Sequence, residues 1–168
     1  MKKTLLLITS VLFITSAVFS QSKVDINNLM ERGGLLYAPN KEKPYTGSVF
    51  DLFENGQEKL NGRYRKGIKN GKWTEWNSNG QKMYEKTYKD GKANGKWTEW
   101  YENGQKQVEA TFKDDKRDRL WTWWYQNGQK RQETTYKDGE IVGVWTSWNE
   151  KGQKEWEGTL AEYQAEKA

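Results

Sequence analysis

Tryptophan and glycine positions repeat at a fixed interval along most of the chain. The tryptophans form two series with a period of 24 residues: Trp73, Trp97, Trp121, Trp145, and Trp76, Trp100, Trp124, Trp148. The turn glycines keep the same spacing, at Gly56, Gly80, Gly104, Gly128 and Gly152, and all but the last follow an asparagine. Such a period indicates a repeat protein in which each unit packs against its neighbours.

Each unit predicts a β-hairpin. Two short segments rich in Trp, Tyr, Thr and Phe are separated by Asn-Gly turns, and Asp-Gly turns link one unit to the next. Both residues of these turns tolerate positive φ, and the tight loop has either two or three residues. In the second strand, Tyr84 and Tyr88 alternate with Glu85 and Thr87, as in a strand with one apolar side.

The two tryptophans of each first strand are three residues apart, so they face opposite sides of a sheet unless a bulge intervenes. We therefore predict an all-β fold: an elongated single-layer antiparallel meander of 24-residue β-hairpin repeats, with short capping segments at both ends. Equivalent rings lie about 9.6 Å apart in such a sheet. They either replace the missing second layer or form a ladder for a ligand.

The first twenty residues differ from the rest and predict a signal peptide over residues 1–20. Lys2 and Lys3 precede an apolar run that ends at Phe19, and small residues stand at the expected cleavage positions before Gln21. A retained membrane-spanning helix is the alternative. Removal of the signal leaves no transmembrane segment and places the protein in the periplasm or outside the cell. No cysteine is present to carry a lipid anchor.

The repeats set the expected domain boundaries. Residues 21–46 form an N-terminal capping segment and the first hairpin strand, and residues 47–160 form the repeat array. The units begin near residues 47, 71, 95, 119 and 143. Residues 161–168 form a C-terminal cap or tail that protects the last strand edge.

Composition excludes several functions. The mean hydropathy of −1.13 is typical of disorder, but 14% aromatic residues indicate a packed fold. The net charge of +5, which falls to +3 without Lys2 and Lys3, is too small and too dispersed to predict a nucleic-acid partner. The absence of histidine and cysteine removes the commonest catalytic bases, thiolate nucleophiles and metal ligands. We expect no enzyme activity, no cofactor and no metal.

Two stretches resemble the MORN-repeat variant family: "PYTGSVFDLFENGQEKLNGRYRKGIKNGKW" and "GKWTEWYENGQKQVEATFKD". The resemblance extends from residue 44 to about residue 160, with "DINNLMERGGLLYAP" similar to the strand that usually precedes the first unit. It implies an elongated hairpin array with turns at Gly47, Gly71, Gly95, Gly143 and the Asn-Gly pairs. Some bacterial members carry an antitoxin or immunity label, so the resemblance also implies a toxin-neutralising role.

One unit departs from this pattern. In "FKDDKRDRLWTWWYQNG", Asp115 and Arg119 replace two link glycines, and Trp123 adds a third tryptophan. We expect this link to adopt another conformation, because arginine does not readily take positive φ. The departure is either drift in a tolerant loop or a binding feature built from Lys116, Arg117, Arg119 and Trp123.

The sequence leaves three functional hypotheses. The first is an exported scaffold that binds a protein through a sheet face or the irregular link. The second is the antitoxin role, and the third is binding of a cell-wall glycan or a choline-type ligand on the tryptophan ladder. The candidate binding residues are Trp76, Trp100, Trp124, Trp148, Trp123, Arg117 and Arg119.

Overall fold

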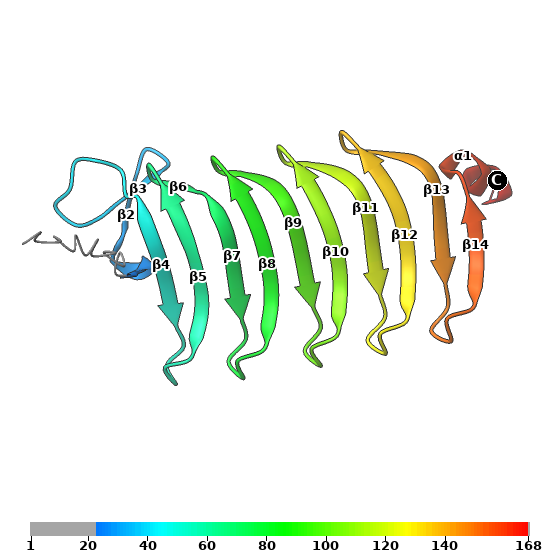
Figure 1. Cartoon of the computed structure of the whole chain (residues 1–168), viewed down its shortest axis with the longest axis horizontal. Coiled ribbons are helices and arrows are strands. Elements are labelled where there is room, and N and C mark those ends of the chain that lie inside the picture. The colour runs from blue at the N-terminus through cyan, green and yellow to red at the C-terminus, as the bar shows by residue number, and fades with distance from the viewer. Residues whose placement is uncertain (1–22, 168) are drawn as a thin grey trace, which may run out of the picture.

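The computed structural model describes residues 23–167 as a row of hairpins along one long axis (Figure 1). The predicted signal peptide lies outside the described residues. The N-terminal elements are β1 (Val24–Asp25), the 3-10 helix η1 (Ile26–Asn28), β2 (Met30–Arg32) and β3 (Leu35–Tyr37). The array comprises β4 (Gly47–Leu52), β5 (Glu58–Arg65), β6 (Ile68–Lys69), β7 (Gly71–Trp76), β8 (Lys82–Lys89), β9 (Lys92–Trp100), β10 (Lys106–Lys113), β11 (Lys116–Trp124), β12 (Lys130–Lys137), β13 (Glu140–Trp148) and β14 (Lys154–Gly158). Helix α1 (Leu160–Lys167) ends the described chain.

The predicted meander is confirmed. From β4 to β14 each strand pairs antiparallel with the next strand of the path, while β6 pairs only with β5. Strand β1 adds a short parallel pairing beside β4, which completes a 12-stranded sheet, and β2 pairs with β3 in a separate two-stranded sheet. Neighbouring strands are thus joined by short turns, which is the connection that antiparallel pairing allows.

The two ends of the strands use different turns. At the Asn-Gly end, Gly80 N donates to Asn77 O (3.0 Å) and Asn77 N donates to Gln81 O (2.9 Å), which closes a three-residue loop. Of the two loop sizes left open by the sequence, the structure has the three-residue loop, and in it only the glycine has positive φ. The asparagine instead caps the loop with its side chain, since Asn79 Oδ1 accepts a hydrogen bond from Gln81 N (3.0 Å).

The opposite end has two-residue turns with both residues in the left-handed region. Asp90 and Gly91 have φ of 48° and 85°, and Asp138 and Gly139 have 53° and 98°. These values match the expectation for Asp-Gly, because a turn of this twist suits the right-handed twist of its strands. Each turn also contacts the preceding unit, as when Gly139 N donates to Arg117 O (2.9 Å).

The tryptophans of one strand lie on opposite faces of the sheet. The register shift near the Asn-Gly turn inserts an extra residue in the second strand, such as Met83, and leaves the alternation from Trp73 to Trp76 intact. We define the aromatic face as the one that carries Trp73, Trp97, Trp121 and Trp145. The lysine face is the one that carries Trp76, Trp100, Trp124 and Trp148, together with the lysine–glutamate pairs described below.

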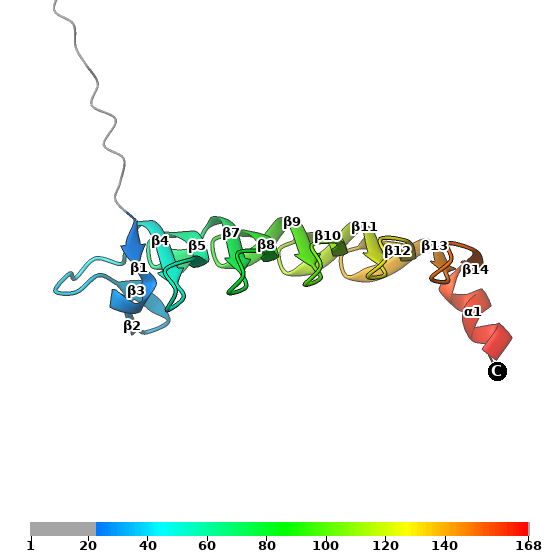
Figure 2. The same cartoon turned by 90° about the horizontal axis from the view of Figure 1, so that it is seen from below.

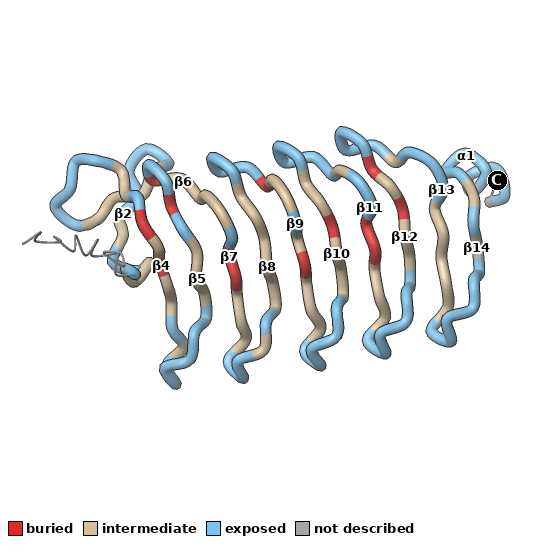
Figure 3. The backbone as a smooth tube through the Cα atoms, viewed as in Figure 1, coloured by how far each residue is buried: buried red, intermediate tan, exposed pale blue. Residues whose placement is uncertain are grey.

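The core lies on the aromatic face. Edge-to-face and tilted ring contacts run along it, including Tyr64–Trp73 (5.0 Å between centroids), Phe112–Trp121 (5.0 Å) and Trp121–Tyr136 (5.3 Å). The buried residues lie along the strands, and the Asn-Gly turns are exposed (Figure 3). Aromatic rings therefore supply the shielded area that a second layer provides in other folds.

Both ends of the array are capped on this same face. Ile26, Leu29 and Leu36 pack against the N-terminal cluster of Val49, Tyr64 and Trp73. At the other end, Tyr163 of α1 contacts Trp145 (4.5 Å) and Trp156 (5.2 Å). Figure 2 shows the N-terminal elements β2 and β3 and helix α1 projecting to one side of the sheet. Within residues 23–167, no other helix or strand covers the aromatic face between these two caps.

Candidate functional site

The predicted ladder of Trp76, Trp100, Trp124 and Trp148 occupies the lysine face, and all four rings are half-buried. Three of them lie beneath a lysine of the preceding hairpin. Lys82, Lys106 and Lys130 place Nζ at 5.7, 5.8 and 5.8 Å from the ring centroids of Trp100, Trp124 and Trp148. The ladder is therefore a regular series of rings, three of which are partly covered by a cation.

Each of these lysines also pairs with a glutamate on the same face. The carboxylate of Glu85 forms ion pairs with Lys72 Nζ (2.8 Å) and Lys82 Nζ (3.2 Å). The carboxylate of Glu109 forms ion pairs with Lys106 Nζ (2.7 Å) and Lys96 Nζ (3.0 Å). Desolvation acts to raise the pKa of Glu85, but the hydrogen bonds from both lysines outweigh it and lower that pKa. The hydrogen bond from Lys106 is the largest cause that lowers the pKa of Glu109. These pairs hold the carboxylates ionised.

Cations also lie over rings of the aromatic face. Lys69 Nζ is 4.4 Å from the Trp73 ring centroid, and Lys86 Nζ is 4.2 Å from that of Trp97. Burial lowers the pKa of Lys69, since the apolar surroundings disfavour its charged form. Arg117 lies over Trp121 (4.8 Å), so the uncapped part of this face carries positive charge beside aromatic surface.

The irregular link separates its predicted site residues. Arg117 and Trp123 lie on the aromatic face, where Trp123 contacts Trp121 (5.5 Å) and Arg117 donates to the Tyr136 hydroxyl (3.0 Å). Arg119 points into solvent, with its side chain 80% exposed and Nε 3.5 Å from Asp118. The structure therefore brings Trp123 and Arg117 together on the aromatic face. The other predicted residues are elsewhere: Arg119 is in solvent, and the ladder of four tryptophans is on the lysine face.

The expectation that this link changes conformation is wrong. Arg119 has φ of 61° and Asp115 has φ of 67°, so both keep the left-handed backbone of the glycines they replace. Asp115 gains a compensating contact, because its Oδ1 accepts a hydrogen bond from Ala93 N (2.7 Å). The side chain of Arg119 offers no equivalent bond to the backbone among the contacts of the described residues.

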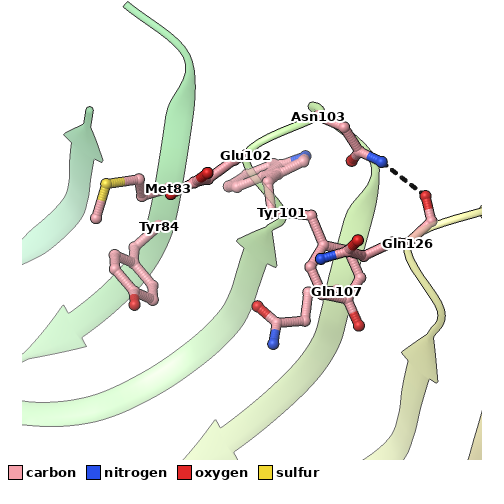
Figure 4. Close-up of a pocket in the computed structure, with 8 residues that line it drawn as sticks. Met83, Tyr84, Tyr101, Glu102, Asn103, Gln107 and Gln126 are labelled. Atoms are coloured by element: carbon pink, nitrogen blue, oxygen red, sulfur yellow. Dashed lines mark hydrogen bonds between the residues drawn. The ribbon is translucent and has the colours of Figure 1, made fainter. Parts of the chain in front are cut away.

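Recesses lie between adjacent Asn-Gly turns. The larger, about 560 Å³, includes Met83, Trp100 and Tyr101, with the amides of Asn103, Gln107 and Gln126 at its border (Figure 4). A second, about 350 Å³, is formed one unit earlier by Phe53, Leu60, Trp76 and Met83. Two of the predicted residues, Trp76 and Trp100, thus border recesses that recur with the repeat.

A smaller recess of about 190 Å³ opens on the uncapped part of the aromatic face. We call it the central recess. Its lining residues are Trp97, Glu99, Val108, Ala110, Phe112, Trp121 and Trp123. Of these, the sequence analysis named only Trp123 as a candidate. Equivalent positions give little further signal, since the position of Ala110 carries Lys86 and Thr134 in two other units but glycine, Gly62 and Gly158, in the remaining two.

The described residues show no constellation typical of metal binding: residues 23–167 contain no group of three or more His, Cys, Asp or Glu side chains able to hold an ion. Within the same residues, no helix has the length and hydrophobicity to cross a membrane.

The repeated hairpins, the single sheet and the two-faced tryptophan pattern define a single-layer β-hairpin repeat protein. Residues 69–90, 93–114 and 120–138, three consecutive repeats, match the MORN repeat variant family. No curated protein matches the chain. MORN repeats form scaffolds that often bind proteins or membranes, and the family is generally non-catalytic.

Proposed function

We propose that this chain is an exported, non-catalytic scaffold that binds another protein on the uncapped part of its aromatic face. One observation carries the proposal: the caps cover both ends of this face and leave its centre open. Trp97 and Trp123 remain half-exposed there, on strands held at both edges by neighbours. Large rings fixed on a rigid sheet are typical anchors of protein interfaces.

The proposed location is the periplasm or the cell exterior, as the signal peptide predicts. Fractionation of cells that express the full chain tests this location. We expect a product shortened by about twenty residues in the periplasmic or culture fraction, identified by its N-terminal sequence. A full-length product that stays in the cytoplasm would contradict export.

Affinity capture from the cell envelope tests the binding surface. We expect the wild-type protein to retain one partner at constant stoichiometry and the Trp123→Ser variant to retain it at least tenfold less. Serine is a suitable replacement because Ser147 occupies the equivalent position of the next unit. Trp100→Ala is the matched control on the lysine face. Loss of capture by the control alone would transfer the interface to that face, and capture of no protein would refute the proposal.

The antitoxin role is the case in which this partner is a toxin. It rests on the family resemblance, and co-expression tests it. If the gene beside this one encodes a growth-inhibiting protein, we expect the wild-type chain to restore growth and Trp123→Ser to restore it poorly. Equal rescue by the empty vector would exclude neutralisation by this chain.

A glycan-binding function has one specific observation in its favour. The three lysine–ring distances on the lysine face agree to within 0.1 Å, so the ladder presents a periodic surface. A polymer of sugar rings can stack on such a series. Retention of the wild-type chain on purified cell-wall glycan, and its loss in Trp100→Ala, would favour this function over protein binding.

A further inference from the structure

The central recess has a defined shape. Its floor is formed by two residues of β10, Val108 and Ala110, and its walls stand on the neighbouring strands. Trp97 of β9 forms one wall, and Trp121 and Trp123 of β11 form the other. Phe112 also lines the recess, and its ring lies 4.7 Å from that of Trp97 and 5.0 Å from that of Trp121.

This recess depends on the residue at the position of Ala110 and on the additional ring of Trp123. At the position of Ala110, two other units carry Lys86 and Thr134, whose longer side chains take up space between the tryptophans. Where that position is Gly62, the ring of Trp73 descends onto the backbone, 2.3 Å from the place a Cβ would occupy. In the unit of Ala110 the rings stay apart, and Trp123 extends one wall. The recesses beside the turns, by contrast, recur from unit to unit.

The electrostatics of the recess disfavour a cationic ligand. Lys86 belongs to β8 and lies 4.2 Å from the Trp97 ring, on the side of β9 away from the recess. Arg117 lies over Trp121 and also over Tyr136 of β12, and its strand partner is Phe112 of β10. Both walls therefore already bind a cation, and a second cation between them would be repelled by both.

The polar groups of the recess are too few for a sugar. Glu99 is its single charged lining residue, and its Oε1 accepts a hydrogen bond from Trp97 Nε1 (3.0 Å). A pyranose needs several directed hydrogen bonds, whereas the remaining lining consists of aromatic and aliphatic side chains. The volume of about 190 Å³ is also below the range of about 300–1,000 Å³ typical of small-molecule sites. A single bulky apolar side chain fits both observations.

We propose that the central recess is the anchor pocket for one bulky apolar side chain, such as phenylalanine or leucine, of an acidic segment of a protein partner. The acidic character follows from Lys86 and Arg117, which flank the recess over Trp97 and Trp121 and together exceed the single carboxylate of its lining, Glu99. Opposite charge on the partner complements them and orients the segment. The inference rests on the proposed protein-binding function and specifies its contact point.

Nuclear magnetic resonance with small probes tests the pocket directly on the folded chain. The probes are N-acetyl-phenylalaninamide, tetramethylammonium and methyl glucoside, followed through the indole N–H signals of Trp97, Trp121 and Trp123. We expect saturable shifts with the phenylalanine probe alone, with a dissociation constant on the order of 1 mM for so few atoms. Stronger binding of the cation or the glucoside, or no saturation with the phenylalanine probe, would overturn the proposal.

Two variants locate the binding. Val108→Tyr fills the recess with the residue that Tyr84 supplies in the preceding unit, and we expect it to weaken the phenylalanine probe at least tenfold. Trp123→Ser removes part of a wall and provides a second variant should the first fail to fold. Trp100→Ala, on the opposite face, serves as the control with unchanged binding. Unchanged binding in both recess variants would refute the assignment.

A pair of peptides tests the charge of the partner. We expect the peptide Glu-Glu-Phe-Glu-Glu to bind at least threefold more tightly than Lys-Lys-Phe-Lys-Lys at low salt, and the difference to shrink as salt screens the charges. The reverse order would refute the acidic segment. These probes also separate the two proposals: envelope capture that is insensitive to Val108→Tyr, with no probe binding, removes the pocket but leaves a protein-binding scaffold.

Discussion

The assignment of the core to one face predicts unequal costs for two tryptophan truncations. Trp73 lies on the aromatic face and is 2% exposed, whereas Trp100 lies on the lysine face and is half-buried. Full burial of a ring of about 250 Å² has an upper limit of about 6 kcal/mol, and measured losses for Trp→Ala in cores are about 3–5 kcal/mol. Both changes remove the same atoms, so their difference reports burial.

The surroundings of Trp73 affect the expected cost of Trp73→Ala in two ways. Its ring packs over Gly62 and contacts Tyr64 and Tyr88, so its removal leaves a cavity. Its Nε1 finds no hydrogen-bond partner among the described residues, and removal of such a buried group recovers about 1 kcal/mol. We therefore expect Trp73→Ala to cost about 3–4 kcal/mol. Trp100→Ala should cost about 1–2 kcal/mol, because its ring is less deeply buried than that of Trp73.

Urea unfolding followed by far-ultraviolet circular dichroism measures both values. The comparison is valid if the slopes of the two transitions agree, since a changed slope signals unfolding of part of the array. A cost for Trp100→Ala equal to or above that for Trp73→Ala would refute the reasoning. It would place the stabilising packing on the lysine face or on both faces equally.

Three further predictions concern single positions. Gly62→Ala should cost about 1–3 kcal/mol in urea unfolding, because its Cβ would meet the Trp73 ring at 2.3 Å; an unchanged midpoint would show that the ring moves freely. Arg119→Gly should raise the free energy of unfolding by about 1 kcal/mol, because glycine adopts the positive φ of this position without strain. Asp115→Gly should give no such gain, because it removes the hydrogen bond from Ala93 N to Asp115 Oδ1. An equal gain in both variants would contradict the role of that hydrogen bond. The lowered pKa of Glu85 predicts stability that is present above the usual value of 4.5 and is lost as pH falls through the lowered pKa, and Glu85→Gln should reduce that acid dependence in denaturation curves.

The sequence predicts most of the fold because the repeat is a local pattern. Strand positions, turn positions and the meander follow from a 24-residue interval and from glycines that need positive φ. Loop size at the Asn-Gly turns does not follow, since Asn-Gly suits both two-residue and three-residue loops. The extra residue that resolves this, such as Met83, is an ordinary strand residue with no sequence signal of its own.

The sequence predicts the candidate site less well, because tryptophan recurs on both faces. Nothing in the spacing of Trp73 and Trp76 indicates which ring is buried; that depends on the rings of neighbouring strands, such as Tyr64 beside Trp73 and Tyr136 beside Trp121. The prediction of a conformational change at Arg119 is wrong for a related reason. Strand pairing on both sides of β11 fixes the backbone there, and this packing outweighs the preference of one residue.

Ala110 and Trp123 differ in how far they depart from the other units. Ala110 is 2% exposed and packs with Trp121 and Tyr136, and two other units carry the smaller Gly62 and Gly158 at its position. Trp123, by contrast, adds a partly exposed ring at a position where the units on either side have Glu99 and Ser147, so packing of the repeat does not require it. In a repeat protein, where neighbouring units set the packing that suffices for stability, such a local violation is the expected mark of a binding site.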